Sequence, residues 1–174
     1  TLTKSSGSAE KICGSIDNKL SMAAECMNHQ MYVEAAKLYE SCLNGAYASD
    51  GKVLFGLAQA AVEAGDWTKA GAALARLKAD APKMRPLEAR LLEARVLEGR
   101  GETDAAIALY RELIPVFVGL EARYRYGSLL LRLGKQEAAM EMFNEVVKHA
   151  KRFTSSLEEE ERWASAAKQA IVGN

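Results

Sequence analysis

Residues with the chemistry for catalysis or metal binding are few in this chain and widely spaced. It has two histidines, His29 and His149, and three cysteines. Cys26 and His29 have the spacing of half a zinc site, but no second pair follows with a matching spacing. We therefore interpret Cys26 as a thiol of the core and His29 as a turn residue, and we expect no metal site.

Two other short patterns are better explained by structure than by chemistry. Gly99-Arg100-Gly101 is half of a dinucleotide-binding loop, but Asp104 replaces the later glycine. The run Glu158 to Glu161 is favourable at the positive end of a helix and needs no catalytic role. No Ser-His-Asp or Cys-His-Asp set can be assembled. We therefore expect neither an enzyme nor a cofactor.

The composition argues against several classes of partner. Lys and Arg number 23 and Asp and Glu number 23, so no net charge points to nucleic acid or to an anionic membrane. No apolar run reaches the roughly 18 residues that span a bilayer, so we expect no membrane insertion by this segment. The odd number of cysteines cannot form a complete disulfide set, which favours a reducing compartment, and we expect the cytoplasm.

A phrase consisting of a turn and a helix recurs along the chain at intervals of 35, 36 and 33 residues. Each copy has a turn triplet, then an alanine, then a large apolar residue. The copies are Gly65-Asp66-Trp67 with Ala70 and Leu74, Gly101-Glu102-Thr103 with Ala106 and Tyr110, and Gly134-Lys135-Gln136 with Ala139 and Phe143, preceded by a degenerate copy, Gln30-Met31-Tyr32 with Ala35 and Tyr39. This period predicts a solenoid of helix pairs.

Helix signals divide the chain into four helix pairs and one further helix. Apolar residues recur at helical spacing without a period-two pattern, so the fold class is all-α. Asp50 and Asp66 are placed to cap helices, and Pro115 ends one. The expected helices cover about 16–29, 33–44, 51–64, 67–79, 86–99, 103–114, 120–133, 136–152 and 156–172, the last beginning with a capping-box spacing between Ser155 and Glu158.

The same pattern predicts a flexible Ser-rich linker over residues 1–15 and a repeat domain over residues 16–174. The repeats are expected at about 16–49, 50–85, 86–119 and 120–153, followed by a capping helix over 156–172. Trp163, Ala167 and either Ala170 or Ile171 of that helix are expected to cover the apolar side of the last repeat. Small residues are expected where the helices of a pair cross closely, namely Ala58, Ala94, Gly127, Ala70, Ala106 and Ala139.

The turn triplet, the alanine, the large residue after it and Pro82 at the end of the second copy resemble the tetratricopeptide repeat family. The resemblance covers residues 16–152. It implies an α-α superhelix of four helix pairs with a C-terminal capping helix, and a role in binding proteins. The first copy departs from the pattern because Gln30 replaces the turn glycine, and Val118 stands where a closing proline is usual.

A narrower resemblance concerns the order of three segments, GLAQAAVEAGD, EARYRYGSLLLRLG and EEERWASAAKQAI. They are similar to the cytoplasmic tail of uncharacterised bacterial inner-membrane proteins, which carry membrane helices before tetratricopeptide repeats. This resemblance implies that a segment upstream of Thr1 anchors the chain to the inner membrane.

The family resemblance further implies a groove lined by the first helix of each pair. The residues expected to bind a protein or peptide there are Lys52, Phe55, Gln59, Leu92, Arg95, Tyr124, Arg125, Ser128 and Arg132. Phe55 and Tyr124 are the expected apolar anchors, and the arginines are expected to bind carboxylates of an acidic partner. In the alternative interpretation, Phe55 and Leu91 are buried between repeats, and the arginines pair with Glu88, Glu98 and Glu121.

Three hypotheses of function follow from these patterns. In the first, the chain is a scaffold that binds a protein segment in its groove as part of a larger membrane-tethered protein. In the second, it is a self-association module that forms homo-oligomers. In the third, it is the regulatory domain of an enzyme whose catalytic part lies outside this sequence.

Overall fold

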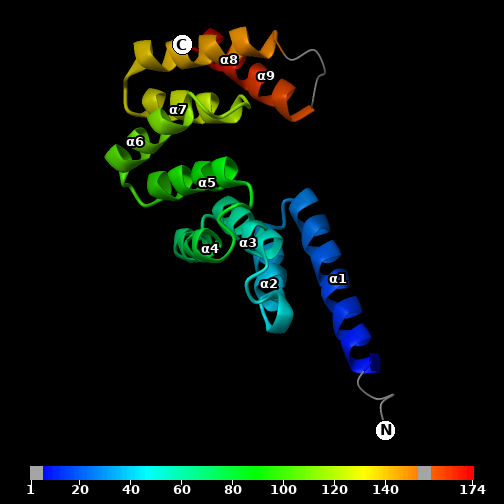
Figure 1. Cartoon of the computed structure of the whole chain (residues 1–174). Helices are drawn as coiled ribbons and strands as arrows, with labels where there is room; N and C mark the ends of the chain where they lie inside the picture. Colours follow the sequence, from blue (N-terminus) through cyan, green and yellow to red (C-terminus); the bar gives the residue numbers. More distant parts are fainter. Residues whose placement is uncertain (1–5, 153–157) are drawn as a thin grey trace. The chain divides into compact units, whose positions relative to one another are not determined.

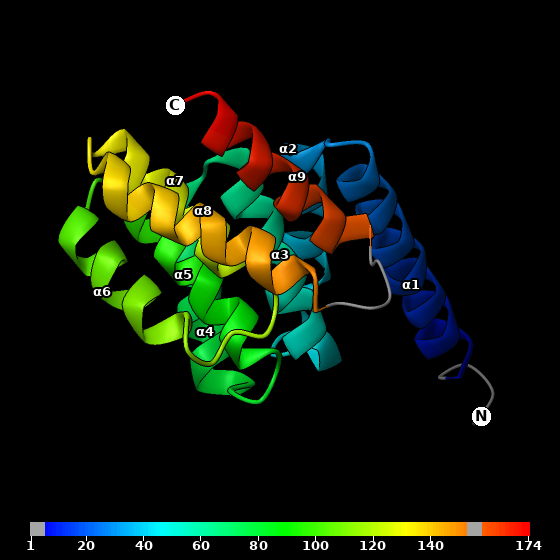
Figure 2. The ribbon, with the colours of Figure 1, turned by 90° about the horizontal axis from the view of Figure 1, so that it is seen from above.

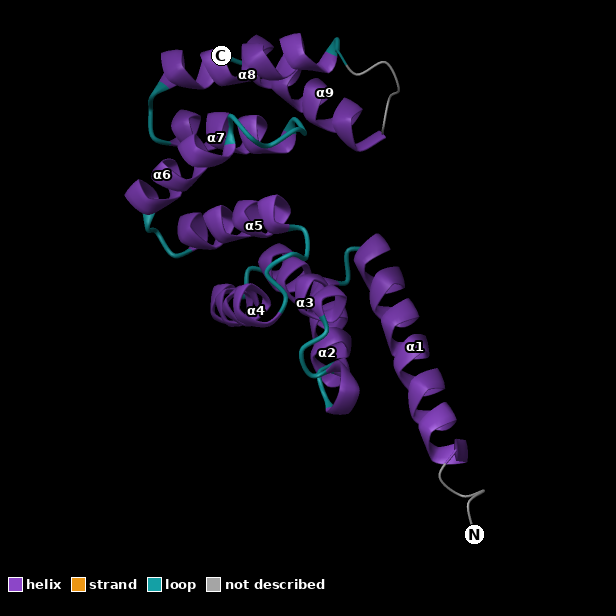
Figure 3. Cartoon of the chain, viewed as in Figure 1, coloured by secondary structure: helices purple, strands orange, loops and turns teal. Residues whose placement is uncertain are grey.

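The computed structural model describes residues 6–152 and 158–174, and every regular element in this part of the chain is helical (Figure 1, Figure 3). The α-helices are α1 (Ser6–Asn28), α2 (Tyr32–Cys42), α3 (Gly51–Ala64), α4 (Trp67–Asp80), α5 (Pro86–Gly99), α6 (Thr103–Leu113), α7 (Glu121–Arg132), α8 (Gln136–Ala150) and α9 (Glu158–Val172), and a 3₁₀ helix, η1 (Gly45–Tyr47), precedes α3. From α2 onward the helices begin and end close to the predicted ranges. The all-α helical-repeat fold is therefore confirmed.

The first helix is longer than the sequence pattern predicts. α1 begins at Ser6, so the expected start near residue 16 is wrong. Ala9, Glu10 and Lys11 favour helix, and extending a helix that has already nucleated costs little, so α1 continues into the segment assigned to a linker. Residues 1–5, and Ser155 of the expected capping box, lie outside the described residues.

Aspartates begin two of the helices of the second repeat. Asp50 Oδ1 accepts a hydrogen bond from the Val53 amide at 3.0 Å, and Asp66 Oδ1 accepts one from the Lys69 amide at 3.0 Å. Each bond satisfies an amide that lacks a partner within its own helix, which contributes about 1 kcal/mol to helix stability. Both predicted caps are confirmed.

The turn between the two halves of each repeat has one conformation throughout. Gly65, Gly101 and Gly134 all have φ 75°, in the left-handed region that glycine adopts without strain. Gln30 occupies the same turn position in the degenerate first copy and has φ 58°. The turn geometry of the repeat therefore persists where the glycine has been lost, at a cost of about 1–2 kcal/mol for a residue with a side chain.

The chain divides into two compact units, Thr1–Glu102 and Thr103–Asn174, and the division falls inside the third repeat. In the first unit α1 packs on α2, α2 on α3 and α3 on α4, and α5 packs against both α3 and α4. The residues buried in the main core of this unit include Leu54, Phe55, Leu57, Ala58, Val62, Leu77, Leu92 and Val96.

Small residues lie where helices approach one another most closely. Ala58, Ala70, Ala94, Ala106 and Ala139 are completely buried. A Cβ at Gly127 of α7 would lie 2.9 Å from the Phe143 ring of α8, and one at Gly56 of α3 would lie 2.7 Å from the Tyr39 ring of α2. These distances are shorter than van der Waals contact, so a larger residue would force the helices apart. The close crossing predicted at Gly127 is confirmed, and the five alanines predicted at the other crossings are completely buried.

The second unit is closed by its last helix. α9 packs on α8 and also contacts α7, and the three helices lie side by side in Figure 1 and Figure 2. Trp163 and Ala167 of α9 are buried, which confirms the predicted role of this helix as a cap. Glu160 Oε2 also accepts a hydrogen bond from the Leu120 amide at 3.0 Å, which ties α9 to the start of α7.

Candidate protein-binding surfaces

The residues first considered for metal chemistry lie apart from any cluster of ligands. Cys26 is half-buried against the core of the first unit, and His29 Nε2 lies 3.7 Å from a Glu25 carboxylate oxygen. Within residues 6–152 and 158–174, no three His, Cys, Asp or Glu residues gather into a group able to hold a metal ion. Among the described helices, none combines the length and the apolar composition needed to cross a membrane.

The predicted groove residues of the first unit divide into a buried and an exposed set. Phe55 of α3 and Leu92 of α5 are each only 6% exposed and belong to the core. Lys52 and Gln59, one turn to either side of Phe55, are exposed. The same helix face therefore contributes apolar side chains to the core and polar ones to the surface.

Arg85 adds a cation to this face that sequence reasoning missed. Its guanidinium carbon lies 4.6 Å from the centre of the Phe55 ring and covers what the core leaves exposed of that side chain. Arg85 Nε lies 3.8 Å from a Glu88 carboxylate oxygen, and the Arg85 side chain is 55% exposed. A Cβ at Gly51 would lie 3.2 Å from Met84, so the start of α3, next to Lys52, closely approaches the segment before Arg85.

The backbone at Arg85 is strained. Its φ is 42° and its ψ is 59°, a left-handed conformation that is unfavourable for arginine and more so before a proline such as Pro86. Residues held in such conformations cluster at binding sites. We therefore treat Lys52, Phe55 and Arg85, called here the Phe55 cluster, as a candidate binding site.

Arg95 is already neutralised by a neighbouring helix. Its Nη1 lies 2.7 Å from Glu63 Oε1 of α3, and the two side chains are only 15% and 29% exposed. Glu63 is a partner that the sequence analysis did not name. A ligand carboxylate would have to displace Glu63 from a partly desolvated pair, which is less favourable than approaching the exposed Arg85.

The predicted groove residues of the second unit lie close to α9. The Tyr124 ring is 5.3 Å from the Trp163 ring and 5.7 Å from the Phe143 ring. Arg125 Nε lies 2.7 Å from Glu121 Oε1, and its guanidinium lies 5.0 Å from the Trp163 ring.

Two further predicted residues of the second unit lie along α7. Ser128 Oγ donates a hydrogen bond to the Tyr124 carbonyl at 3.0 Å, and Arg132 is exposed in the last turn of the helix. The pairing of Arg125 with Glu121 agrees with the alternative interpretation of the sequence for that arginine.

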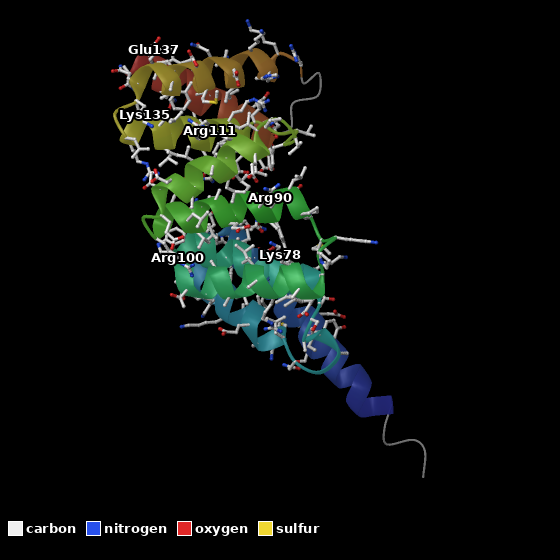
Figure 4. The ribbon with its side chains drawn as sticks, turned by 60° about the vertical axis from the view of Figure 1, so that its left-hand side comes forward. Lys78, Arg90, Arg100, Arg111, Lys135 and Glu137 are labelled. Atoms are coloured by element: carbon white, nitrogen blue, oxygen red, sulfur yellow. The ribbon has the colours of Figure 1, made fainter. Side chains whose placement is uncertain are left out.

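A second surface of the first unit is hollowed, between α4 and α5. One cavity of about 250 Å³ is lined by Leu74, Leu77, Lys78, Ala81, Pro82, Met84, Pro86, Ala89, Arg90 and Glu93. A neighbouring cavity of about 240 Å³ is lined by Gly71, Leu74, Ala75, Lys78, Glu93, Val96, Leu97 and Arg100. The two share Leu74, Lys78 and Glu93 and form one depression, called here the α4–α5 groove. Figure 4 labels three of its basic residues, Lys78, Arg90 and Arg100.

Among the described residues, Tyr39 and His149 have pKa values displaced by burial. Burial raises the pKa of the Tyr39 phenol, and Cys42 and Cys26 add to the shift. Burial also lowers the pKa of His149, and Arg123 and Arg152 lower it further. Tyr39 packs against the core of the first unit, and His149 lies near the end of α8. The charge of the two surfaces described above therefore depends on lysine, arginine and carboxylates.

Known proteins show the same organisation of the chain. The sequence model described as tetratricopeptide repeat matches residues 55–116 and 91–170. No curated protein matches the chain significantly. Among solved structures, MamA AMB-1 is similar with a TM-score of 0.56 and 20% identity, covering 90% of this chain and 82% of that one. MamA MSR-1 is similar with a TM-score of 0.52 and 22% identity, covering 88% of this chain and 92% of that one.

These structural similarities, at such low identity, bear on the fold alone. The family match covers most of the chain, and its residues include the turn glycines Gly65, Gly101 and Gly134 with their shared φ. Repeats of this kind stack into extended surfaces suited to holding other proteins. The chain therefore belongs to the tetratricopeptide repeat family.

Proposed function

We propose that the chain is an adaptor that binds an acidic, partly apolar segment of another protein on the face formed by its first helices. Family membership supports protein binding in general. The proposal goes further and assigns the contact in the first unit to the Phe55 cluster, with Lys52 and Arg85 as the charged residues.

The observation that carries the proposal is the position of Arg85. A strained backbone holds its guanidinium over Phe55, where an exposed cation lies directly above an apolar ring. A carboxylate of the partner would bind the guanidinium, while an apolar side chain beside it would pack on the alkyl parts of the exposed Lys52 and Arg85 side chains, since Phe55 itself is only 6% exposed. The exposed Glu88 competes only weakly, because a surface ion pair contributes about 0–1 kcal/mol.

The second unit provides a further set of basic residues. Arg125 and Arg132 lie on α7, and the guanidinium of Arg125 stacks over the Trp163 ring. We include Tyr124, Arg125, Ser128 and Arg132 in the proposal as a second contact region for the same acidic segment or for another one. Arg125 has to exchange its bond with Glu121 for one to the partner.

The test uses a displayed library of linear peptides selected on the parent chain. We expect selected peptides to be rich in Asp and Glu beside an apolar residue. We expect their binding, measured by fluorescence anisotropy, to weaken about tenfold in the double variant Lys52→Glu, Arg85→Gln and to weaken with added salt.

The matched control is Lys37→Glu, which reverses an exposed lysine of the same unit outside the Phe55 cluster, and circular dichroism checks that each variant is helical. Unchanged binding in the double variant, or equal loss in the control, would contradict the assignment of this face. Selected peptides without acidic residues would contradict the proposed partner chemistry.

The proposal also places the chain in a larger protein tethered to a bacterial membrane. This part rests on the narrower resemblance described for the sequence. Reading the gene upstream of Thr1 tests it directly, and the absence of a membrane-spanning segment there would refute the tether without affecting the binding face.

A further inference from the structure

The α4–α5 groove is separate from the face proposed above. Its α5 wall contains Ala89, Glu93 and Val96, at three- and four-residue spacing, and Arg100 continues it just after the helix. The predicted groove residues of α5, Leu92 and Arg95, project from another side of the helix, because one residue of a helix turns the side chain by about 100°. The α4–α5 groove and the Phe55 cluster therefore have different lining residues, although Met84 and Pro86 of the groove flank Arg85 in the chain.

The floor of the α4–α5 groove is apolar. Leu74 of α4, with Met84 and Ala89, presents hydrocarbon to the cavities, and Leu77 lies beneath them, only 2% exposed. Burial of such surface by a partner is favourable at about 25 cal/mol for each Å² removed from water. The groove thus has the concave, apolar character of a binding site rather than of a flat solvated face.

The rim of the groove is basic. Lys78, Arg90 and Arg100 line it, against one carboxylate, Glu93 (Figure 4). Arg100 Nη2 also donates to the Trp67 carbonyl at 3.3 Å, which holds its guanidinium at the end of the groove. Three cations against one anion, in a chain with balanced charge, favour a partner that presents carboxylates on both sides of an apolar strip.

The shape of the groove favours a helix as the bound element. Both walls are helices whose backbone groups bond internally, so they offer few partners to the backbone of an extended peptide. A bound helix satisfies its own backbone and packs its side-chain ridge between the two walls. The groove runs along α4 from Gly71 to Ala81, which is about 15 Å, or nearly three turns.

From these observations we propose that the α4–α5 groove is a second docking site, which binds an acidic amphipathic helix of a partner protein. Leucine-like side chains of the partner lie on Leu74, Met84 and Ala89, and its flanking carboxylates pair with Lys78 and Arg100. This inference is independent of the Phe55 cluster, because no residue of that cluster lines the groove.

The experiment uses a displayed library of helical peptides with a fixed apolar face and randomised flanks, selected on the parent chain. We expect enrichment of Glu and Asp on the flanks. The tightest peptide is then synthesised with a twin in which lysine replaces each acidic residue, and we expect the acidic peptide to bind at least about tenfold more tightly than the twin.

Two variants locate the binding. Ala75→Trp fills the groove from an exposed position on α4, and we expect it to abolish binding of the acidic helix. Lys78→Glu should weaken it about tenfold by turning an attraction into a repulsion. Lys37→Glu, an exposed lysine of α2 outside both proposed sites, is the matched control, and we expect parent-like affinity from it. Circular dichroism confirms that all three remain helical.

The result that overturns the proposal is parent-like binding by both Ala75→Trp and Lys78→Glu, or a selection without acidic flanks. Failure of this site is distinguishable from failure of the Phe55 cluster, because each library responds to a different variant. A second copy of this chain is the other possible occupant, and light scattering of the parent measures whether it dimerises. Dimers that Ala75→Trp converts to monomers would assign the groove to a second copy of this chain and refute a separate partner.

Discussion

The contact between Trp67 and Gly99 makes a sharp prediction about stability. The Trp67 indole, at the start of α4, packs against the last residue of α5, and a Cβ at Gly99 would lie far inside the van der Waals distance of indole Cε2 and Cδ2. Gly99→Ala would therefore force the rigid ring of Trp67 away from the core cluster on which it packs.

The sign of the effect follows from two opposing contributions. Alanine is favoured over glycine within a helix by about 1 kcal/mol, and less at the last residue. Overpacking costs about 1–3 kcal/mol when a rigid neighbour has to move. We expect Gly99→Ala to lower the free energy of unfolding by about 1–2 kcal/mol net, because an indole ring cannot yield by a small rotation.

Gly71→Ala is the matched control. A Cβ there would lie 2.7 Å from Arg100 Nη2, which is also too close, but the obstacle is the end of a flexible side chain. Arg100 can move aside, so the gain in helix propensity should dominate and the variant should be as stable as the parent or slightly more stable. Alanine at these two glycine positions, both with a close neighbour, should thus change the free energy of unfolding in opposite directions.

Urea titration followed by circular dichroism measures both variants, and the slope of the transition checks that unfolding remains comparable. In a Trp67→Leu background the ring is gone, so Gly99→Ala should become neutral or stabilising. Equal effects of Gly99→Ala in both backgrounds would refute the packing of Trp67 on Gly99, as would a stabilised single variant.

Two further substitutions test features of the repeats. Gln30→Gly should raise the free energy of unfolding by about 0.5–1 kcal/mol, because it relieves the left-handed strain at φ 58° while making the unfolded chain more flexible; an unchanged urea midpoint would argue against that strain. Glu160→Ala should lower it by about 1 kcal/mol by removing the hydrogen bond to the Leu120 amide, whereas the exposed neighbour variant Glu161→Ala should not, and equal urea midpoints for the pair would show that α9 is not held by this bond.

The sequence was sufficient for local structure because its signals are local. Asp50 and Asp66 cap helices through amides three residues away, and Gly65 ends α3 at the predicted turn. The predicted start of α1 is wrong because the prediction gave more weight to the polar composition of the first residues than to their modest helix propensity.

The candidate sites depend on contacts that no local pattern contains. Helical spacing places Phe55 and Arg95 on one face each, but it does not show that Arg85 covers Phe55 or that Glu63 pairs with Arg95. Arg85 left one signal that could have been used, since an arginine before Pro86 at a helix start has few favourable conformations. The α4–α5 groove left none, because its walls come from different repeats.

The division of the chain at Glu102 bears on where further repeats can be inserted into such a protein. Duplication copies a first helix together with the second helix that follows it, whereas the first compact unit ends on α5, a first helix. An insertion between α5 and α6 interrupts neither compact unit, but one just before Pro86 separates α5 from α3 and α4, against which it packs. The position at which an insertion least disturbs the compact units is thus one helix away from the position at which the sequence repeat begins.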